Sequence, residues 1–154
     1  MPASTATVWE TIAGEAERES SLWAAALRPE DAREHVPVFS PLADEEFALG
    51  VESIYEGYLL HYGRPRLFSP ADRDGAVLLG DYLYAHGLVR ITALGDVEAV
   101  ARLAELLSLC AHLRAEGDEG DGQAWAETIG GLGDSGPSPE AVRRALALHA
   151  ERVD

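Results

Sequence analysis

Apolar residues recur at helical spacing through most of the chain, and no stretch shows the strict apolar and polar alternation of a half-buried strand. Over residues 7–27, small and apolar side chains stand three or four positions apart, at Trp9, Ala13, Ala16, Ser20, Trp23 and Leu27. This spacing places them on one side of a helix. The pattern therefore predicts one helix that ends before Pro29, because a residue that precedes proline is disfavoured in the helical conformation.

The middle of the chain predicts three more helices. They cover residues 42–61, 69–94 and 96–115, each with apolar residues at helical spacing. Ser69 is suited to cap the second of these helices and Asp96 the third, because short polar side chains accept hydrogen bonds from the free amides of a first turn.

The remaining segments predict shorter elements. Residues 29–41 hold three prolines and several apolar side chains, which predicts an ordered connector. The acidic, glycine-rich residues 116–122 predict a solvated loop, and two peripheral helices are expected over 123–132 and 138–153. The pattern as a whole predicts a single all-α domain over residues 1–154, a bundle of about five to six helices.

Two pairs of glycines stand inside the two most apolar helices. Gly50 and Gly57 are seven residues apart, and so are Gly80 and Gly87, so the members of each pair share one side of their helix. Glycine inside a helix costs ~1 kcal/mol against alanine. The pairs therefore predict places where another backbone approaches closely.

Charge narrows the classes of partner. The 154 residues carry a net charge of −15, and all of their basic residues are arginines. A surface this acidic repels phosphates, so neither a nucleic-acid partner nor an anionic membrane surface is expected. Charge of this sign favours solubility and suits a basic protein partner.

Cysteine usage and apolar runs exclude further classes. Cys110 is the only cysteine, which rules out a disulfide within the chain and a cysteine-cluster metal site, and its apolar neighbours predict a buried, inert thiol. No uncharged run approaches the ~20 residues that span a bilayer, so no membrane insertion is expected. The first ten residues lack the features of a signal peptide, and a cytoplasmic location is the default.

The order of several short motifs resembles the trans-isoprenyl diphosphate synthase (polyprenyl synthetase) family. Leu59–His61 is similar to the apolar-apolar-His-like end of one family helix, Gly63–Pro65 to a Gly-Arg-Pro turn, and Ala76–Leu83 to a helix with Leu-x-Gly-Asp-x-Leu. The resemblance covers roughly Glu46–Gly117. It implies part of the isoprenoid synthase fold.

The chain departs from this family where the chemistry lies. Family members ionise an allylic diphosphate with magnesium ions held between two aspartate-rich motifs. Here His61 is followed almost directly by Gly63–Pro65, so the first motif is missing, and the second would lie downstream of the residues present. We therefore expect a degenerate member with no catalytic residues, no metal ligands and no cofactor.

The surviving family positions give candidates for a ligand site or an interface. These candidates are His61, Arg64, Gly80, Asp81, Tyr84 and Gly87. Asp81 is either a structural acid satisfied by hydrogen bonds at a helix contact or a ligand contact. His61 is either a packed histidine or a ligand. Arg64 and Arg66 either hold a diphosphate or form a surface turn that pairs with acids. Tyr84 and the other aromatic residues either line an apolar pocket or pack in a core or interface.

Three functions follow as hypotheses. The first is a non-catalytic accessory protein that self-associates, as a homodimer, or joins a larger complex through residues 69–115, because family members dimerise through similar helices and this region is retained. The second is a module that binds an isoprenoid or quinone-type lipid. The third is residual prenyltransferase activity completed by a partner chain.

Overall fold

The computed structural model describes residues 7–153, and these form a wholly helical protein. The all-α prediction is confirmed. Three short 3₁₀ turns precede the third helix, and the described residues contain no strand, only two isolated bridges. The helices are α1 (Val8–Glu19), α2 (Ser21–Ala26), α3 (Ala48–Tyr62), α4 (Arg73–Ala93), α5 (Val97–Ala115), α6 (Asp121–Gly130) and α7 (Pro139–Arg152).

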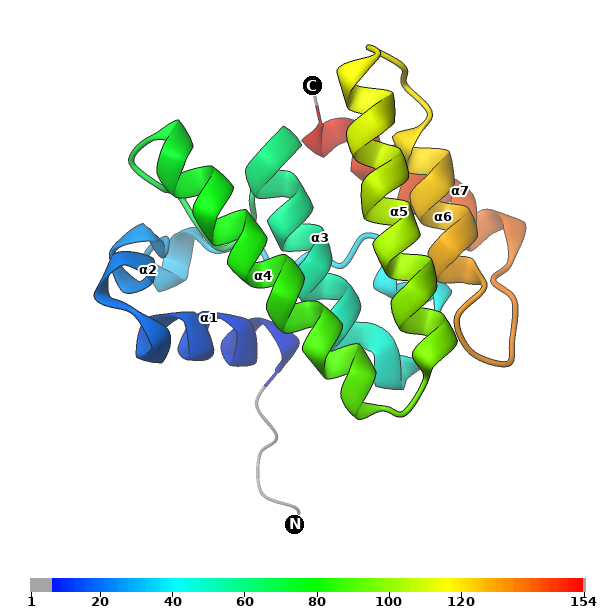
Figure 1. The fold of residues 1–154 in the computed structure, drawn as a ribbon, viewed down its shortest axis with the longest axis horizontal. Helices are drawn as coiled ribbons and strands as arrows, with labels where there is room; N and C mark the ends of the chain where they lie inside the picture. Colours follow the sequence, from blue (N-terminus) through cyan, green and yellow to red (C-terminus); the bar gives the residue numbers. More distant parts are fainter. Residues whose placement is uncertain (1–6, 154) are drawn as a thin grey trace.

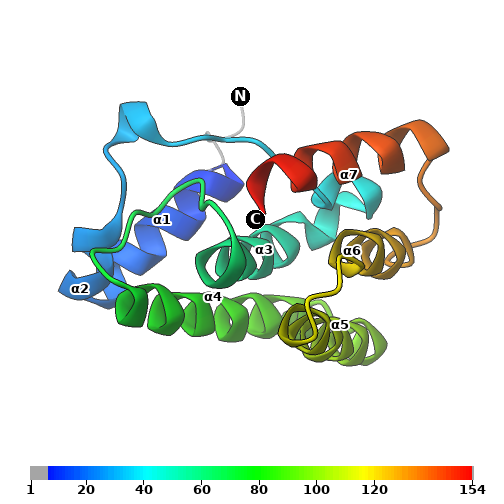
Figure 2. The same cartoon turned by 90° about the horizontal axis from the view of Figure 1, so that it is seen from above.

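Helix α3 lies at the centre of the molecule. Helix α4 crosses it on one side, α1 and α2 pack at one end, and α5, α6 and α7 pack at the other (Figure 1). Viewed from above, α4 and α5 form one outer layer, with α3 behind them and α7 on the far side of α3 (Figure 2). No described helix combines the length and the apolar character needed to cross a bilayer.

The two glycine pairs meet where α3 and α4 cross. A methyl group on Gly87 would lie 2.8 Å from the carbonyl oxygen of Gly50, closer than real side chains approach a backbone oxygen. The other pair, Gly57 and Gly80, face each other in the same way further along the helices. The predicted close approach is confirmed, and it occurs within the chain.

The first predicted helix is interrupted. Ser20 adopts an extended conformation, with φ −160° and ψ 139°, and separates α1 from α2. Its hydroxyl accepts a hydrogen bond from the amide of Leu22, so Ser20 caps the second helix. The apolar spacing continues across this break, and for that reason the pattern alone predicted one continuous helix.

Other helix ends follow local signals to different degrees. Helix α3 begins at Ala48, six residues later than 42, after two 3₁₀ turns at Ser40–Leu42 and Glu45–Phe47. Helix α4 is capped by Asp72 in place of Ser69. Asp96 caps α5 as predicted. The connector over residues 29–41 is ordered, and its Val38 and Phe39 belong to the core.

The C-terminal helices are part of the core, which corrects their prediction as peripheral. Trp125 of α6 is fully buried between α3 and the connector, where its ring stacks on Phe39 with 5.5 Å between centroids. Ile129 of α6 and Ala145 of α7 are buried in the same cluster. A second, smaller cluster lies between α1, α2, α3 and α4.

Candidate functional site

Four of the six candidate residues lie together at the C-terminal end of α3. The Nε2 atom of His61 lies 3.1 Å from Oδ1 of Asp81 and 3.2 Å from the carbonyl oxygen of Val77, so one N–H faces two acceptors. The His61 ring packs on Tyr84 with 5.0 Å between centroids. The His61 ring can lie against Gly80 only because glycine has no side chain: a methyl group there would collide with the ring. Asp81 is therefore an exposed acid at a helix contact, not a buried one.

The other two candidates lie elsewhere. Gly87 belongs to the crossing with Gly50, two turns further along α4. Arg64 is exposed at the turn after α3, and its guanidinium donates to the carbonyl oxygen of Glu151 at 3.1 Å. Its amide bonds the carbonyl oxygen of Arg152, which joins this turn to the end of α7. The six candidates do not form one site.

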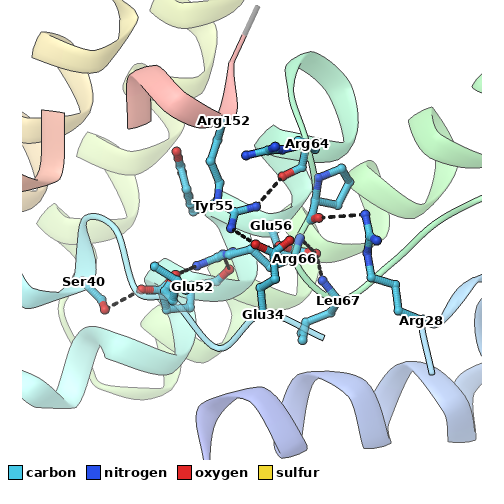
Figure 3. A network of polar contacts seen from close by, with 12 residues as sticks. Arg28, Glu34, Ser40, Glu52, Tyr55, Glu56, Arg64, Arg66, Leu67 and Arg152 are labelled. Carbon is cyan, nitrogen blue, oxygen red and sulfur yellow. Dashed lines mark hydrogen bonds and ion pairs between the residues drawn. The ribbon is translucent and has the colours of Figure 1, made fainter. Parts of the chain in front are cut away.

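Arg66 is fully buried, which corrects the prediction of a surface turn. Its guanidinium donates to Glu52 at 2.7 Å and to Glu56 at 3.0 Å (Figure 3). The ring of Trp9 lies on the guanidinium with 4.7 Å from its central carbon to the centroid, and Tyr55 lies within cation–π distance as well. The prediction that acids pair with this arginine is confirmed.

The acids of this cluster hold two segments on α3, the connector at Ser40 and the turn at Arg66 and Leu67. Glu56 accepts hydrogen bonds from the amides of Arg66 and Leu67, and Glu52 accepts one from the hydroxyl of Ser40 at 2.5 Å. Burial alone lowers the pKa of Arg66, but the charges of the two glutamates outweigh burial and raise it. The guanidinium is already bound on all sides, so this cluster acts as a structural anchor.

A second buried cluster forms around Asp121, which corrects its prediction as part of a solvated loop. Its Oδ2 atom accepts hydrogen bonds from Tyr58 at 2.7 Å, from Arg114 at 2.8 Å and from His149 at 3.2 Å. Tyr55 hydrogen bonds the other ring nitrogen of His149 at 2.7 Å. The cluster joins α3, α5, α6 and α7 in the middle of the fold.

The carboxylate of Asp121 is strongly stabilised. Burial alone would raise its pKa, but the hydrogen bonds from His149, Tyr58 and Arg114 outweigh burial and hold the pKa well below its usual range. Burial and the hydrogen bond to Asp121 together raise the pKa of Tyr58. The charged Asp121 and the neutral Tyr58 and Tyr55 are hydrogen bonded within this cluster. These bonds tie the helices together, so the cluster stabilises the fold.

A cavity of about 710 Å³ lies beside this cluster, between the loop that precedes α6 and the end of α7. Arg114, Asp121 and His149 reach its wall, and the exposed Asp118 and Glu119 stand at its lining. No described group of histidine, cysteine, aspartate and glutamate side chains has the arrangement to hold a metal ion. Arg114 and His149 are both bound to the carboxylate of Asp121.

The aromatic residues pack against one another. Phe39, Tyr55, Tyr58 and Trp125 form mutual ring contacts in the main core, and Trp23 contacts Tyr82 near the start of α4. Tyr84 contacts His61. These side chains contribute to the core, and the lipid-binding alternative gains no support from them.

The outer layer of α4 and α5 carries the clearest surface feature. The described chain has six strongly exposed large apolar residues, and five of them lie between positions 78 and 109. They are Leu78, Val89, Leu94, Val97 and Leu109, and the sixth is Leu22 on α2. Exposed apolar surface is typical of protein interaction sites, so α4 and α5 carry the candidate for one.

One of the two buried clusters has a partial signal in the sequence. Glu52 and Glu56 stand four positions apart in an otherwise apolar helix, so they face one way and need a cation nearby. Arg66 is followed by two apolar residues, a pattern compatible with burial. Nothing local distinguishes Asp121 from its acidic neighbours, because its partners lie on three other helices.

Comparisons of this chain with protein-family models, with curated proteins and with solved structures gave no match. The relationship to the polyprenyl synthetase family therefore stays a prediction from the sequence motifs.

Proposed function

We propose that this chain is a non-catalytic interaction protein that assembles with a protein partner through the outer layer of α4 and α5. The observation that carries the proposal is the concentration of exposed apolar side chains on that layer, five of the six described. Covering such side chains is favourable by roughly 25 cal/mol per Å² of apolar surface removed from water.

The shape of α4 supports the same proposal. One side of this helix is buried on α3, and the residues on the opposite side face outward, among them Leu78, Ala85 and Val89. Gly80 and Gly87 of α4 are already used inside the chain, against Gly57 and Gly50. A partner therefore meets the outward side of the helix, which carries larger apolar side chains.

The non-catalytic part of the proposal is supported by the two buried polar clusters. The charged groups around Arg66 and around Asp121 are bound to each other and to backbone groups. Charged groups that are bound in this way hold the helices in place, which is a structural role. The proposal thus keeps an accessory role, in a homodimer or in a complex with another chain.

Charge insertion on this layer tests the proposal. We expect Val89→Arg, introduced in the source of the protein, to separate the chain from its assembly in native mass spectrometry, because a guanidinium in an apolar contact is costly to desolvate. Leu22→Arg is the matched control, since Leu22 is 58% exposed and Val89 66%, but Leu22 lies on α2. Two results would contradict the proposal. One is an assembly that persists equally in both variants, and the other is a wild-type chain that is isolated without any partner.

A further inference from the structure

Two open cavities follow one side of α5. The first measures about 260 Å³ and lies between the start of α5, the 3₁₀ turn at Glu45–Phe47 and residues 131–134. The second measures about 270 Å³ and lies between α5 and α6, which run side by side in both views (Figure 1 and Figure 2). Arg102 lines both cavities, so together they form one groove, which we call the α5 groove. It extends from Glu98 to Leu109, about 16 Å along the helix.

The α5 groove is strongly acidic. Its lining holds seven carboxylates and a single basic residue, Arg102, which pairs with Glu98 at 2.7 Å. Five of the carboxylates line the first cavity, and Glu105 and Glu127 line the second. Glu105 and Asp134 are exposed, and within the described residues neither carboxylate has a side-chain partner. Because a cleft lined by one sign of charge focuses the electric field, the groove attracts cations.

Apolar side chains accompany these acids. Leu109 lines the second cavity and is 47% exposed. Val97 stands between Asp96 and Glu98 of the first cavity in sequence and is 80% exposed. An occupant that combines positive charge with apolar side chains therefore matches the groove better than a small cation does.

We propose that the α5 groove receives a basic segment of a different protein chain. Its lysine and arginine side chains lie against the carboxylates of the groove, and its apolar side chains cover Val97 and Leu109. Opposite charges on the two surfaces guide association and disfavour wrong partners. This inference rests on the proposed function, because it names the chemistry of the partner on the α5 part of the same surface.

Other classes of occupant fit the groove less well. Within the described residues, no group of carboxylates has the arrangement to hold a metal ion. Nucleic acids and anionic lipids would bring phosphates toward the seven carboxylates. A second copy of this chain carries the same net charge of −15, so it would add negative charge to a groove that is already negative.

Charge reversal tests the inference in the assembly isolated from the source of the protein. We expect Glu105→Arg combined with Glu127→Arg to lower the fraction of assembled chain several-fold in native mass spectrometry, because the second cavity then becomes basic. The matched control combines Glu17→Arg with Glu140→Arg, which reverses two exposed acids on α1 and α7. Both double variants change the net charge equally, so a loss confined to the first is due to the groove.

Carbodiimide cross-linking of the wild-type assembly identifies the occupant, because this reagent joins carboxylates to amines. The chain has no lysine, so links from its side chains to lysine must reach another protein. We expect links that join Glu98, Glu105 or Glu127 to lysines of one segment of the partner. Links that gather on other acids and avoid the groove would overturn the inference, and so would an assembly that contains only copies of this chain.

The two proposals can fail separately. If Val89→Arg releases the chain from its partner and the groove variant does not, the proposed function stands and this inference fails. If neither variant releases the chain, both fail. If the groove variant alone releases it, the basic segment is supported, and α4 is not part of the contact.

Discussion

Gly57 and Gly80 bring the backbones of α3 and α4 into direct contact. A methyl group on Gly57 would lie 2.7 Å from the carbonyl oxygen of Gly80, and one on Gly80 would lie 2.9 Å from the carbonyl oxygen of Gly57. This close approach is thus made inside the chain. The backbone that the glycine pairs predicted to approach closely therefore belongs to the same chain, and the pairs do not mark the association surface.

This contact predicts a specific sensitivity to alanine. We expect Gly57→Ala to lower the free energy of unfolding by about 1–3 kcal/mol, because the rigid carbonyl of Gly80 cannot move without shifting α4. Gly14→Ala in α1 is the control, since its methyl group would meet only the flexible guanidinium of Arg18. The control should gain about 0.5–1 kcal/mol from helix propensity, and urea unfolding measures both. Equal effects at the two sites would contradict the account.

Among single substitutions, we expect replacement of Arg66 to cause the largest loss of stability. Replacing it by leucine leaves Glu52 and Glu56 buried without their cation, and we expect a loss of about 3–5 kcal/mol. Arg143→Leu on the exposed side of α7 should change stability by less than about 0.5 kcal/mol. Urea unfolding of both variants checks this, and similar losses would show that Arg66 is not the anchor.

The Asp121 cluster predicts a defined pH dependence. Because the folded pKa of Asp121 is lowered, its carboxylate contributes stability that is present above its unfolded pKa of about 4 and is lost as pH falls below that value. We expect Asp121→Asn to cost about 2–4 kcal/mol at pH 7. The difference from the wild type should stay constant down to about pH 5 and narrow below about pH 4.

Unfolding free energies measured over this pH range test the prediction. Asp118→Asn is the control from the same loop, because Asp118 is exposed, and it should change stability by less than about 0.5 kcal/mol. A difference between the wild type and Asp121→Asn that does not narrow in acid would show that the carboxylate is not the stabilising form.

Signals local in sequence predicted much of the helical framework. Asp96 caps α5, and Ser138 with Pro139 starts α7, because a cap depends only on the residues next to it. The break at Ser20 and the late start of α3 escaped prediction, since apolar spacing runs on through both. The partners of Arg66 and Asp121 lie ten or more residues away or on other helices, so their burial needed the fold.

The thiol of Cys110 should be inert in the folded protein. Burial raises its pKa to about 11, so the thiolate is scarce at neutral pH as well as shielded. We expect a maleimide to modify Cys110 only at the rate of unfolding, and the rate to rise in urea. Mass spectrometry of the labelled protein measures it, and fast labelling without denaturant would contradict the burial of α5 on the core.

The most direct test of the association surface is how fast a maleimide reaches position 89 in the intact assembly. Val89→Cys and Leu22→Cys replace side chains of similar exposure in the single chain, 66% and 58%, so an uncovered chain would react equally fast at both. If α4 and α5 are covered by a partner, position 89 reacts several-fold more slowly than position 22, and the difference disappears on dissociation. Equal rates in the assembly isolated from the source of the protein would contradict the account.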